Sequence, residues 1–187
     1  MEAADWYELT NGASLQQGDL LMQCPIFSVV GNIPFPIPDS FEPTIDARFF
    51  DIITMTQSCD LENDKIEEVL FAQVIAWPDA VHAGGDANPA LRSREFRRAL
   101  IAGNIPSLSL LHNRIAFPTI AWSVVDFHRL FTLPKSFVRT FADLAGPRLR
   151  LRSPYREHLA QAFARYFMRV GLPHDAKAFE QEGKIEN

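Results

Sequence analysis

The chain has 187 residues, of which 47% are hydrophobic and 22% charged, and its formal net charge is −5. This composition is typical of a soluble globular protein and excludes an intrinsically disordered chain, which combines few apolar residues with a high net charge. The negative charge argues against broad, sequence-independent binding to nucleic acid, because such binding needs a basic surface to neutralise phosphates.

The cellular location is indicated by what the sequence lacks. Its two cysteines, Cys24 and Cys59, are too few for a disulfide framework. The acidic segment 1–9 has no apolar core of the kind found in signal peptides, and no apolar run approaches the length needed to span a membrane. We therefore expect a cytoplasmic protein with no membrane partner.

The first half of the chain predicts strands, because it contains short runs of apolar, β-branched and aromatic residues between turn-forming residues. The expected strands are 20–24, 26–30, 49–56 and 66–77. Pro25 limits the first of them. Four prolines within residues 34–43 exclude a helix and a central strand, so this segment is expected to be an extended surface loop. The polar segment 57–64 is expected to be a turn that joins its two flanking strands into a hairpin.

Helices are expected in the second half of the chain, with strands between them. A loop over 78–89 leads to a helix over 90–102, whose apolar positions include Phe96 and Leu100 and which stops at Gly103. The other expected elements are strands at 107–111, 119–127 and about 130–133, and a helix at 135–144.

The clearest pattern is that of an amphipathic helix over 153–170. Ser153 is a good N-cap, and Pro154 suits the first helical position, where its missing N–H group does no harm. Apolar residues then recur at spacings of three and four, and Gly171 and Pro173 favour termination. The apolar positions are Leu159, Phe163, Tyr166, Phe167 and Val170.

Together these elements predict an α+β fold. We expect a small, strongly bent antiparallel sheet or an SH3-like barrel, with two or three helices packed around it and the C-terminal helix over one open face. Residues 1–173 are expected to form a single domain, followed by a polar tail at 174–187.

The first candidate site is the segment that contains Cys59 and Asp60. A cysteine in a polar turn after a strand is a suitable position for a nucleophile, and a base must then form the thiolate. None of the five histidines stands at a diagnostic spacing, and we take His158 as the candidate partner. The alternative, which is the commoner case, is that Cys59 packs as a small apolar residue while Asp60 makes turn hydrogen bonds.

Metal and cofactor sites have little support in the sequence. A site built from Cys24, Cys59 and a histidine would have no C-x-x-C or H-x-x-x-H pair. The glycine-rich nucleotide-binding motifs, the G-x-S-x-G motif and the H-E-x-x-H motif are also missing. We therefore assign no metal ligand and expect no cofactor.

The second candidate site is the start of the last helix, which has the consecutive residues Tyr155, Arg156, Glu157 and His158. Free N–H groups at a helix start favour anions. Together with Tyr155, Arg156 and the preceding Arg152, they predict a site for a phosphate or carboxylate. The alternative is a helix start that is capped and salt-bridged internally, with Glu157 favoured by the helix dipole.

Two groups of arginines raise the question of a local basic patch. One group lies in the predicted helix over 90–102, and the other alternates with apolar residues just before the last helix. If the two groups met, they would suit RNA or an acidic partner. The alternative, which we favour, is a solvated helix face and a charged edge strand. The groups are Arg92, Arg94, Arg97 and Arg98, and Arg148, Arg150 and Arg152.

The region 18–77 resembles the MazF/PemK-like family in the order of its strand-forming segments. Those segments are Gly18-Asp19-Leu20-Leu21, then Phe50–Ser58 after a proline-containing loop, then Val69–Val74. The resemblance implies a compact SH3-like barrel with attached helices, and a toxin-type endoribonuclease or a relative that has lost this activity. It also implies an arginine and a Ser or Thr near the early strands. Here no arginine precedes Arg48, and Thr56 and Ser58 are the matching hydroxyl residues.

These observations predict a non-enzymatic binding or interaction module, for example a partner subunit or regulator in a bacterial stress or defence system. A protein partner is expected, and RNA is a second candidate partner. Two alternatives remain open. One is a divergent MazF-like endoribonuclease, and the other is a cysteine-dependent enzyme centred on Cys59.

Overall fold

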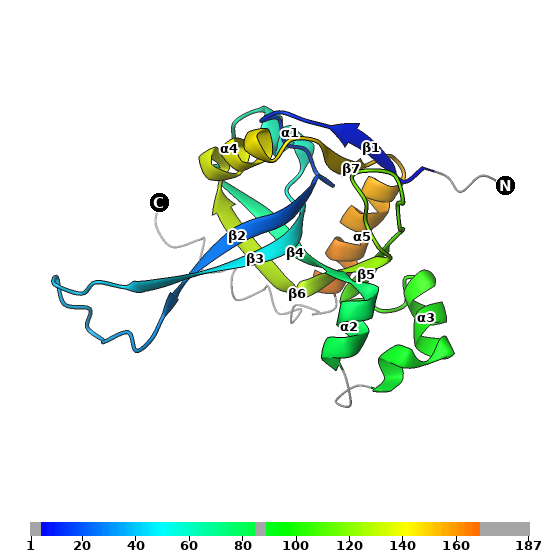
Figure 1. Cartoon of the computed structure of the whole chain (residues 1–187), viewed down its shortest axis with the longest axis horizontal. Coiled ribbons are helices and arrows are strands. Elements are labelled where there is room, and N and C mark those ends of the chain that lie inside the picture. The colour runs from blue at the N-terminus through cyan, green and yellow to red at the C-terminus, as the bar shows by residue number, and fades with distance from the viewer. Residues whose placement is uncertain (1–4, 85–88, 169–187) are drawn as a thin grey trace, which may run out of the picture.

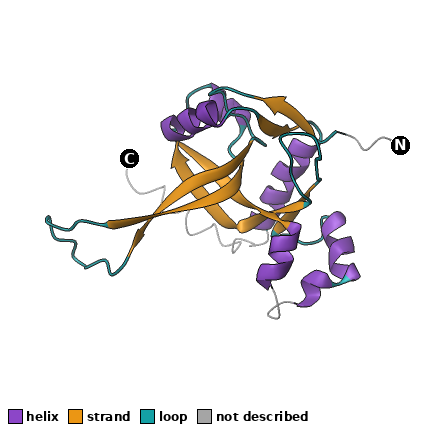
Figure 2. Cartoon of the chain, in the orientation of Figure 1, coloured by secondary structure: helices purple, strands orange, loops and turns teal. Residues whose placement is uncertain are grey.

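The strands form two antiparallel sheets in the computed structural model, which describes residues 5–84 and 89–168 (Figure 1, Figure 2). A five-stranded sheet has the order β2-β3-β4-β6-β5, and a separate two-stranded sheet consists of β1 and β7. The strands are β1 (Tyr7–Thr10), β2 (Leu20–Val30), β3 (Thr44–Thr54), β4 (Glu68–Ala76), β5 (Leu108–Leu111), β6 (Ser123–Pro134) and β7 (Arg148–Leu151). The helices are α1 (Ser58–Glu62), α2 (Trp77–Gly84), the 3-10 helix η2 (Pro89–Arg92), α3 (Arg94–Ile101), α4 (Lys135–Ala145) and α5 (Tyr155–Phe167).

In the body of the five-stranded sheet both faces are covered, so consecutive residues are buried there, as at 52–54 of β3 and 71–74 of β4. Neighbouring residues of a strand point to opposite faces, and Ile52 and Ile53 of β3 accordingly belong to different core clusters. On one face, Leu61 of α1 and Val138 of α4 complete the core. On the other face, Leu159 of α5 packs together with the β1–β7 sheet. The helices α1 and α5 therefore lie on opposite faces.

The predicted α+β class and antiparallel sheet are confirmed, and the C-terminal helix is present. The alternative of an SH3-like barrel is wrong, because the strand order leaves β2 and β5 at opposite edges of an open sheet. The physical reason is that α5 and the β1–β7 sheet cover the face on which a barrel would have to close. This apolar face of the sheet is therefore buried by α5 and the β1–β7 sheet, and not by closure of the sheet on itself.

The strand β2 is continuous through Pro25, where we predicted a break. It is an edge strand of the sheet, and an edge strand tolerates a residue that lacks an N–H group. A register shift follows Leu21 and goes with a positive φ at Gln23. The N–H of Gln23 donates to a carboxylate oxygen of Asp51 at 2.8 Å, which holds this irregularity in place.

Two segments that we predicted as a turn and a loop are partly helical. The segment 57–64 contains α1, and 78–89 contains most of α2 with Pro78 in its first turn, where proline is tolerated. The predicted helix over 90–102 is divided into η2 and α3 at Ser93, whose hydroxyl caps the start of α3. The apolar spacing alone predicted one helix, but a cap and a change of helix type divide it into two.

The C-terminal helix α5 has different ends from those we predicted. It begins at Tyr155, and Pro154 rather than Ser153 occupies the N-cap position, without a side-chain cap. It ends at Phe167. The last predicted turn and the polar tail lie outside the described residues.

The two sheets meet at Gly18. Its φ is +86°, and a Cβ atom there would lie 3.0 Å from the Cβ of Leu151 on β7, so a larger residue would be strained and crowded. The C=O of Gly18 accepts a hydrogen bond from the N–H of Leu151 at 3.0 Å, and its own N–H donates to the C=O of Thr54 on β3 at 2.9 Å. The backbone of this one residue thus joins β7 to the five-stranded sheet.

The carboxylate of Asp19, the next residue, is fully buried between two arginines of β7. Nε of Arg148 lies 3.0 Å from Oδ2, and Arg150 donates to both oxygens, with its Nη2 2.9 Å from Oδ2. Arg148 also donates to the backbone C=O of Gly12 at 2.8 Å and to that of Ser14. These buried charges are paired and hydrogen-bonded, which is the condition under which the protein interior tolerates them.

Replacing Asp19 by asparagine keeps the shape of the side chain and removes the charge that pairs with both arginines. We expect the free energy of unfolding to fall by about 3 to 5 kcal/mol, the usual cost of leaving a buried charge without its partner. Urea unfolding followed by circular dichroism measures this change. Asp46→Asn is the matched control, because Asp46 pairs with Arg48 on the exposed surface, where an ion pair contributes at most about 1 kcal/mol. Equal effects of the two substitutions would contradict the role assigned to Asp19.

Candidate binding cleft

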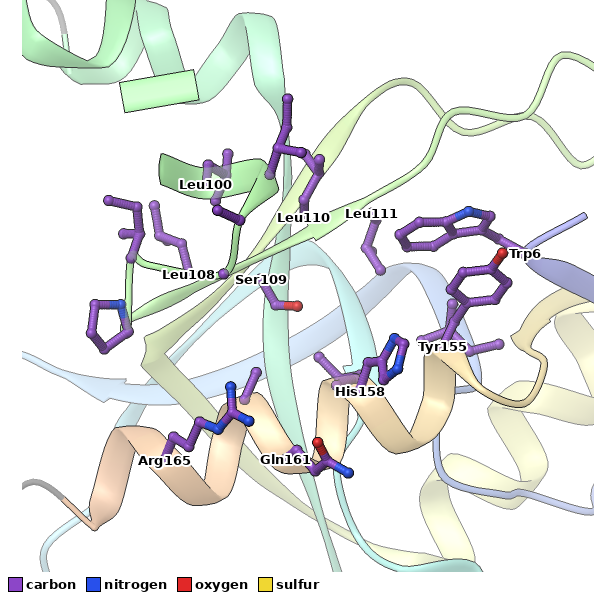
Figure 3. A pocket seen from close by; sticks show the side chains of 18 of the residues that line it. Trp6, Leu100, Leu108, Ser109, Leu110, Leu111, Tyr155, His158, Gln161 and Arg165 are labelled. Atoms are coloured by element: carbon purple, nitrogen blue, oxygen red, sulfur yellow. The ribbon is translucent and has the colours of Figure 1, made fainter. Parts of the chain in front are cut away.

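An open cleft of about 800 Å³ lies between β5, the end of α3 and α5 (Figure 3). The wall formed by α3, β5 and the segment between them is mainly apolar, and includes Leu100, Ile101, Leu108 and Leu110. The polar side chains of the lining come mainly from α5 on the opposite side. The size and the mixture of apolar surface with a few polar groups are those of a ligand-binding site.

The helix α5 has two faces of different composition. His158, Gln161 and Arg165 recur at spacings of three and four, and Figure 3 shows them along the cleft side of the helix. Phe163 and Tyr166 pack against the core on the other side. The amphipathic pattern in the sequence therefore positions this polar row as well as the packing face.

Aromatic rings close one end of the cleft. The rings of Trp6 and Tyr155 stack with centroids 4.1 Å apart and planes at 12°. The row continues from Trp6 to His112 at 5.6 Å and from His112 to Trp122 at 4.3 Å. The backbone C=O of His112 accepts a hydrogen bond from the hydroxyl of the buried Tyr7 at 2.6 Å. Segments that are distant in the sequence thus build one aromatic end wall.

The strand β5 lies at the edge of the five-stranded sheet, and its residues line the cleft. The N–H of Phe127 on β6 donates to the C=O of Ser107 at 2.9 Å, which fixes the alternation of bonded pairs along this ladder. By that alternation, Ser109 pairs toward β6, and Leu108 and Leu110 direct their backbone groups away from it. The N–H of Leu108 is used within a turn. The C=O of Leu108 and both backbone groups of Leu110 remain on the outer edge.

The structure brings two of the predicted site residues, Tyr155 and His158, to the cleft. Arg156 instead pairs with Glu157, with Nη2 3.0 Å from Oε1. Arg152 is exposed, and its Nη1 lies 4.0 Å from a carboxylate oxygen of Asp5. The predicted anion-binding set Arg152, Tyr155 and Arg156 is therefore divided between the cleft and the surface beside it.

The first turn of α5 already holds a carboxylate of this chain. The pKa of Glu157 is lowered, chiefly by a hydrogen bond from its own backbone N–H and then by the guanidinium of Arg156, against the opposing effect of partial burial. The N–H groups of Arg156 and His158 donate to the backbone C=O groups of Arg152 and Pro154. An external anion would have to displace Glu157 to use this helix start.

The predicted catalytic set is also divided. Cys59 and Asp60 lie on α1, where the exposed thiol contacts Oε1 of Gln57 at 3.6 Å and Oδ1 of Asp60 at 3.8 Å. Neither contact is a cation of the kind that stabilises a thiolate. His158 lies on α5, and α1 and α5 cover opposite faces of the sheet. The fold therefore does not place His158 beside Cys59.

The two arginine groups have different environments. Arg148 and Arg150 are buried against Asp19, so they form neither a surface patch with Arg152 nor the solvated edge that we favoured. The other four arginines lie on η2 and α3, whose last turn borders the cleft. They are Arg92, Arg94, Arg97 and Arg98, and the one acidic residue among them is Glu95.

Comparison with known proteins gives no match. No family model matches the chain, and neither a curated protein nor a solved structure matches it. Over residues 5–84 and 89–168, no group of three or more His, Cys, Asp or Glu is placed to hold a metal ion. In the same residues, no helix is long and apolar enough to cross a membrane.

Several parts of the cleft were absent from our predictions. These include the aromatic wall around Trp6, the outer edge of β5, and Gln161 and Arg165 on α5. The segment 107–111 was predicted as a strand, but its sequence does not tell whether it lies at the centre or at the edge of a sheet. Edge position depends on strand order, which is a property of the whole fold.

Alkylation by iodoacetamide tests the predicted nucleophile. We expect Cys59 to react at the rate of a free thiol such as glutathione, because it is exposed and has no cation beside it. Cys24 should be protected until the protein unfolds, because burial raises its pKa to about 12. Mass spectrometry of the digested protein measures both rates, and Cys59→Ser serves as the control. A Cys59 rate about tenfold or more above that of glutathione would instead support a cysteine-dependent enzyme.

Proposed function

We propose that this protein is an interaction module that binds an extended, apolar segment of a protein partner in the cleft between β5, α3 and α5. The observation that carries this proposal is the combination of an apolar cleft with the outer edge of a strand. Proteins that recognise extended peptides commonly add the peptide to such an edge, and pockets beside the edge select its side chains.

Each wall of the cleft has a distinct part in this proposal. The backbone groups of Leu108 and Leu110 form hydrogen bonds with the bound segment. Leu100 and Ile101 pack against its apolar side chains. On the other side, the guanidinium of Arg165 binds a carboxylate of the segment, because arginine matches the planar geometry of that group.

The arginines of η2 and α3 favour a partner segment with acidic residues beside its apolar ones. The whole chain has a net charge of −5, so this basic helix is a local exception. Opposite charges at the rim of an interface accelerate association and select the correct partner. The preferred ligand is therefore an apolar segment that carries Asp or Glu.

Selection from a library of short random peptides on the immobilised protein tests the proposal. We expect selected peptides to combine apolar residues with Asp or Glu. Fluorescence anisotropy should show at least about tenfold weaker binding to Ile101→Glu, since the new charge would be buried against apolar side chains. Leu144→Glu is the matched control, because Leu144 is an equally exposed aliphatic residue near the end of α4 and outside the cleft. Equal binding to both variants, or no selected sequence pattern, would contradict the proposal.

A second candidate, RNA binding, is favoured by the row of aromatic rings. Bases of single-stranded RNA stack on such rings, and each stacked base contributes about 1 to 3 kcal/mol. The rings of Trp6, Trp122 and Tyr155 line the cleft, and Arg165, farther along α5 in the same cleft, offers a cation for a phosphate. The resemblance of 18–77 to the MazF/PemK-like family, which contains endoribonucleases, also points to this candidate.

This candidate predicts that a mixed pool of single-stranded RNA quenches the tryptophan fluorescence of the protein, with an affinity that falls as salt rises. Trp122→Ala should then weaken binding about tenfold, as expected for the loss of one stacked base. Trp77→Ala is the control, because Trp77 stacks on Phe96 and does not line the cleft. Shortening of the RNA would support the endoribonuclease. The absence of both quenching and shortening would exclude both RNA functions.

A further inference from the structure

The strands β2 and β3 continue beyond the five-stranded sheet as a two-stranded arm, which we define as residues 25–50. The strand β3 pairs with β4 only from Asp51 to Thr54, whereas β2 and β3 remain paired as far as Val30 and Thr44. Figure 1 shows the arm and its connecting loop projecting from the body on the side away from α2 and α3. The arm therefore has few neighbours within the described part of its own chain.

One face of the arm is entirely apolar. Residues that pair directly share a face, and the pairs on this face are Pro25 with Phe49, Phe27 with Ala47, and Val29 with Ile45. Phe27, Val29, Ile45 and Phe49 are all exposed. An exposed apolar surface of this extent marks a place where another molecule binds.

The tip of the arm, residues 31–43, continues this apolar character. Ile33, Phe35 and Ile37 alternate with prolines, and the side chain of Phe35 is almost completely exposed. The prolines have no N–H, so between residues 33 and 38 the tip can donate backbone hydrogen bonds only at alternate residues. Its apolar side chains therefore supply most of any binding energy.

We propose that the tip of the arm of one copy binds in the cleft of a second copy of this chain. This inference rests on the proposed function, because it names the segment that the cleft receives. The tip has the chemistry that the cleft favours, since its apolar residues stand beside Asp39 and Glu42 and it contains no Lys or Arg. The cleft offers Arg165 and borders the arginine-bearing helix α3.

Charge favours this pairing over the contact of two arms. Two tips carry the same negative charge and would repel each other when close together. A tip and the surface of α3 carry opposite charges, which attract. The association should therefore weaken as salt is added.

The arrangement of the arm and the cleft determines the geometry of the assembly. In Figure 1 the arm projects on the side away from α3, whose end borders the cleft, so the arm is directed away from the cleft of its own chain. A contact between two different surfaces is heterologous, and its repetition gives head-to-tail chains or rings. The mean size of the assembly should therefore grow with protein concentration.

Mixing two defective variants of the full chain tests the inference by sedimentation velocity, at roughly 1 to 100 µM, the range of weak interfaces. The arm variant carries Phe35→Ser and Ile37→Ser, and the cleft variant carries Ile101→Glu. All three positions are exposed, so both variants should fold, which circular dichroism checks. We expect the wild type and Leu144→Glu to associate and each defective variant to be monomeric. Their mixture should form a dimer and nothing larger, because one arm and one cleft remain intact.

Association of the cleft variant by itself would overturn the inference, because the arm would then bind elsewhere. A monomeric wild type over the whole concentration range would also overturn it. In either case the peptide selection decides separately whether the cleft binds apolar segments of other proteins. A labelled peptide of residues 31–43 provides a direct measurement. It should bind to the arm variant, and this binding should be lost when the arm variant also carries Ile101→Glu.

Discussion

The interaction on which the rest of the structure depends is the burial of Asp19 between Arg148 and Arg150. Removing these charges from water is costly, and the cost is offset only when the groups are held in one geometry with complete hydrogen bonding. The N–H and C=O of Gly18 supply the backbone part of this geometry, on β3 and on β7. The start of β2 and the strand β7 are therefore fixed relative to each other, although well over a hundred residues separate them.

The position of β7 in turn determines that of the cleft. The helix α5 starts four residues after the end of β7, and Leu151 itself lines the cleft. The N–H of Arg152 donates to the C=O of Trp6 at 2.9 Å, so the same segment also holds the aromatic wall. A substitution at Asp19 would consequently alter the cleft by displacing β7, although Asp19 itself does not line the cleft.

The sequence predicts those features that depend on local patterns. The amphipathic helix that became α5, the hairpin of β3 and β4 and the helix from Lys135 all follow from apolar spacing and turn residues. The alternation of Arg148 and Arg150 with apolar residues favoured an edge strand, and the segment is the strand β7. It could not indicate burial, because the partner Asp19 lies far away in the sequence and each charge looks solvated without it.

The candidate site was less predictable than the fold for the same reason. His158 and Tyr155 were identified from their place at a helix start, but their neighbours in the cleft come from other parts of the chain. The pairing of His158 with Cys59 failed because helices on opposite faces of a sheet cannot share a site. Local chemistry can name reactive side chains, whereas the order of strands decides which of them meet.

The arm is anchored at its base and exposes apolar side chains beyond it. An isolated two-stranded ribbon has little stability in water, and here its base is anchored by Phe27 against Phe137 of α4 and by Phe50 against Phe131 of β6. Beyond these contacts, Val29, Ile45 and Phe49 of the apolar face are exposed. The prolines of the tip limit the addition of further strands, as edge prolines do in other sheets. The arm exposes apolar side chains for binding, while its prolines block uncontrolled sheet growth. Such an arm is suited to one specific binding surface, and the chemistry of the cleft matches that of the tip.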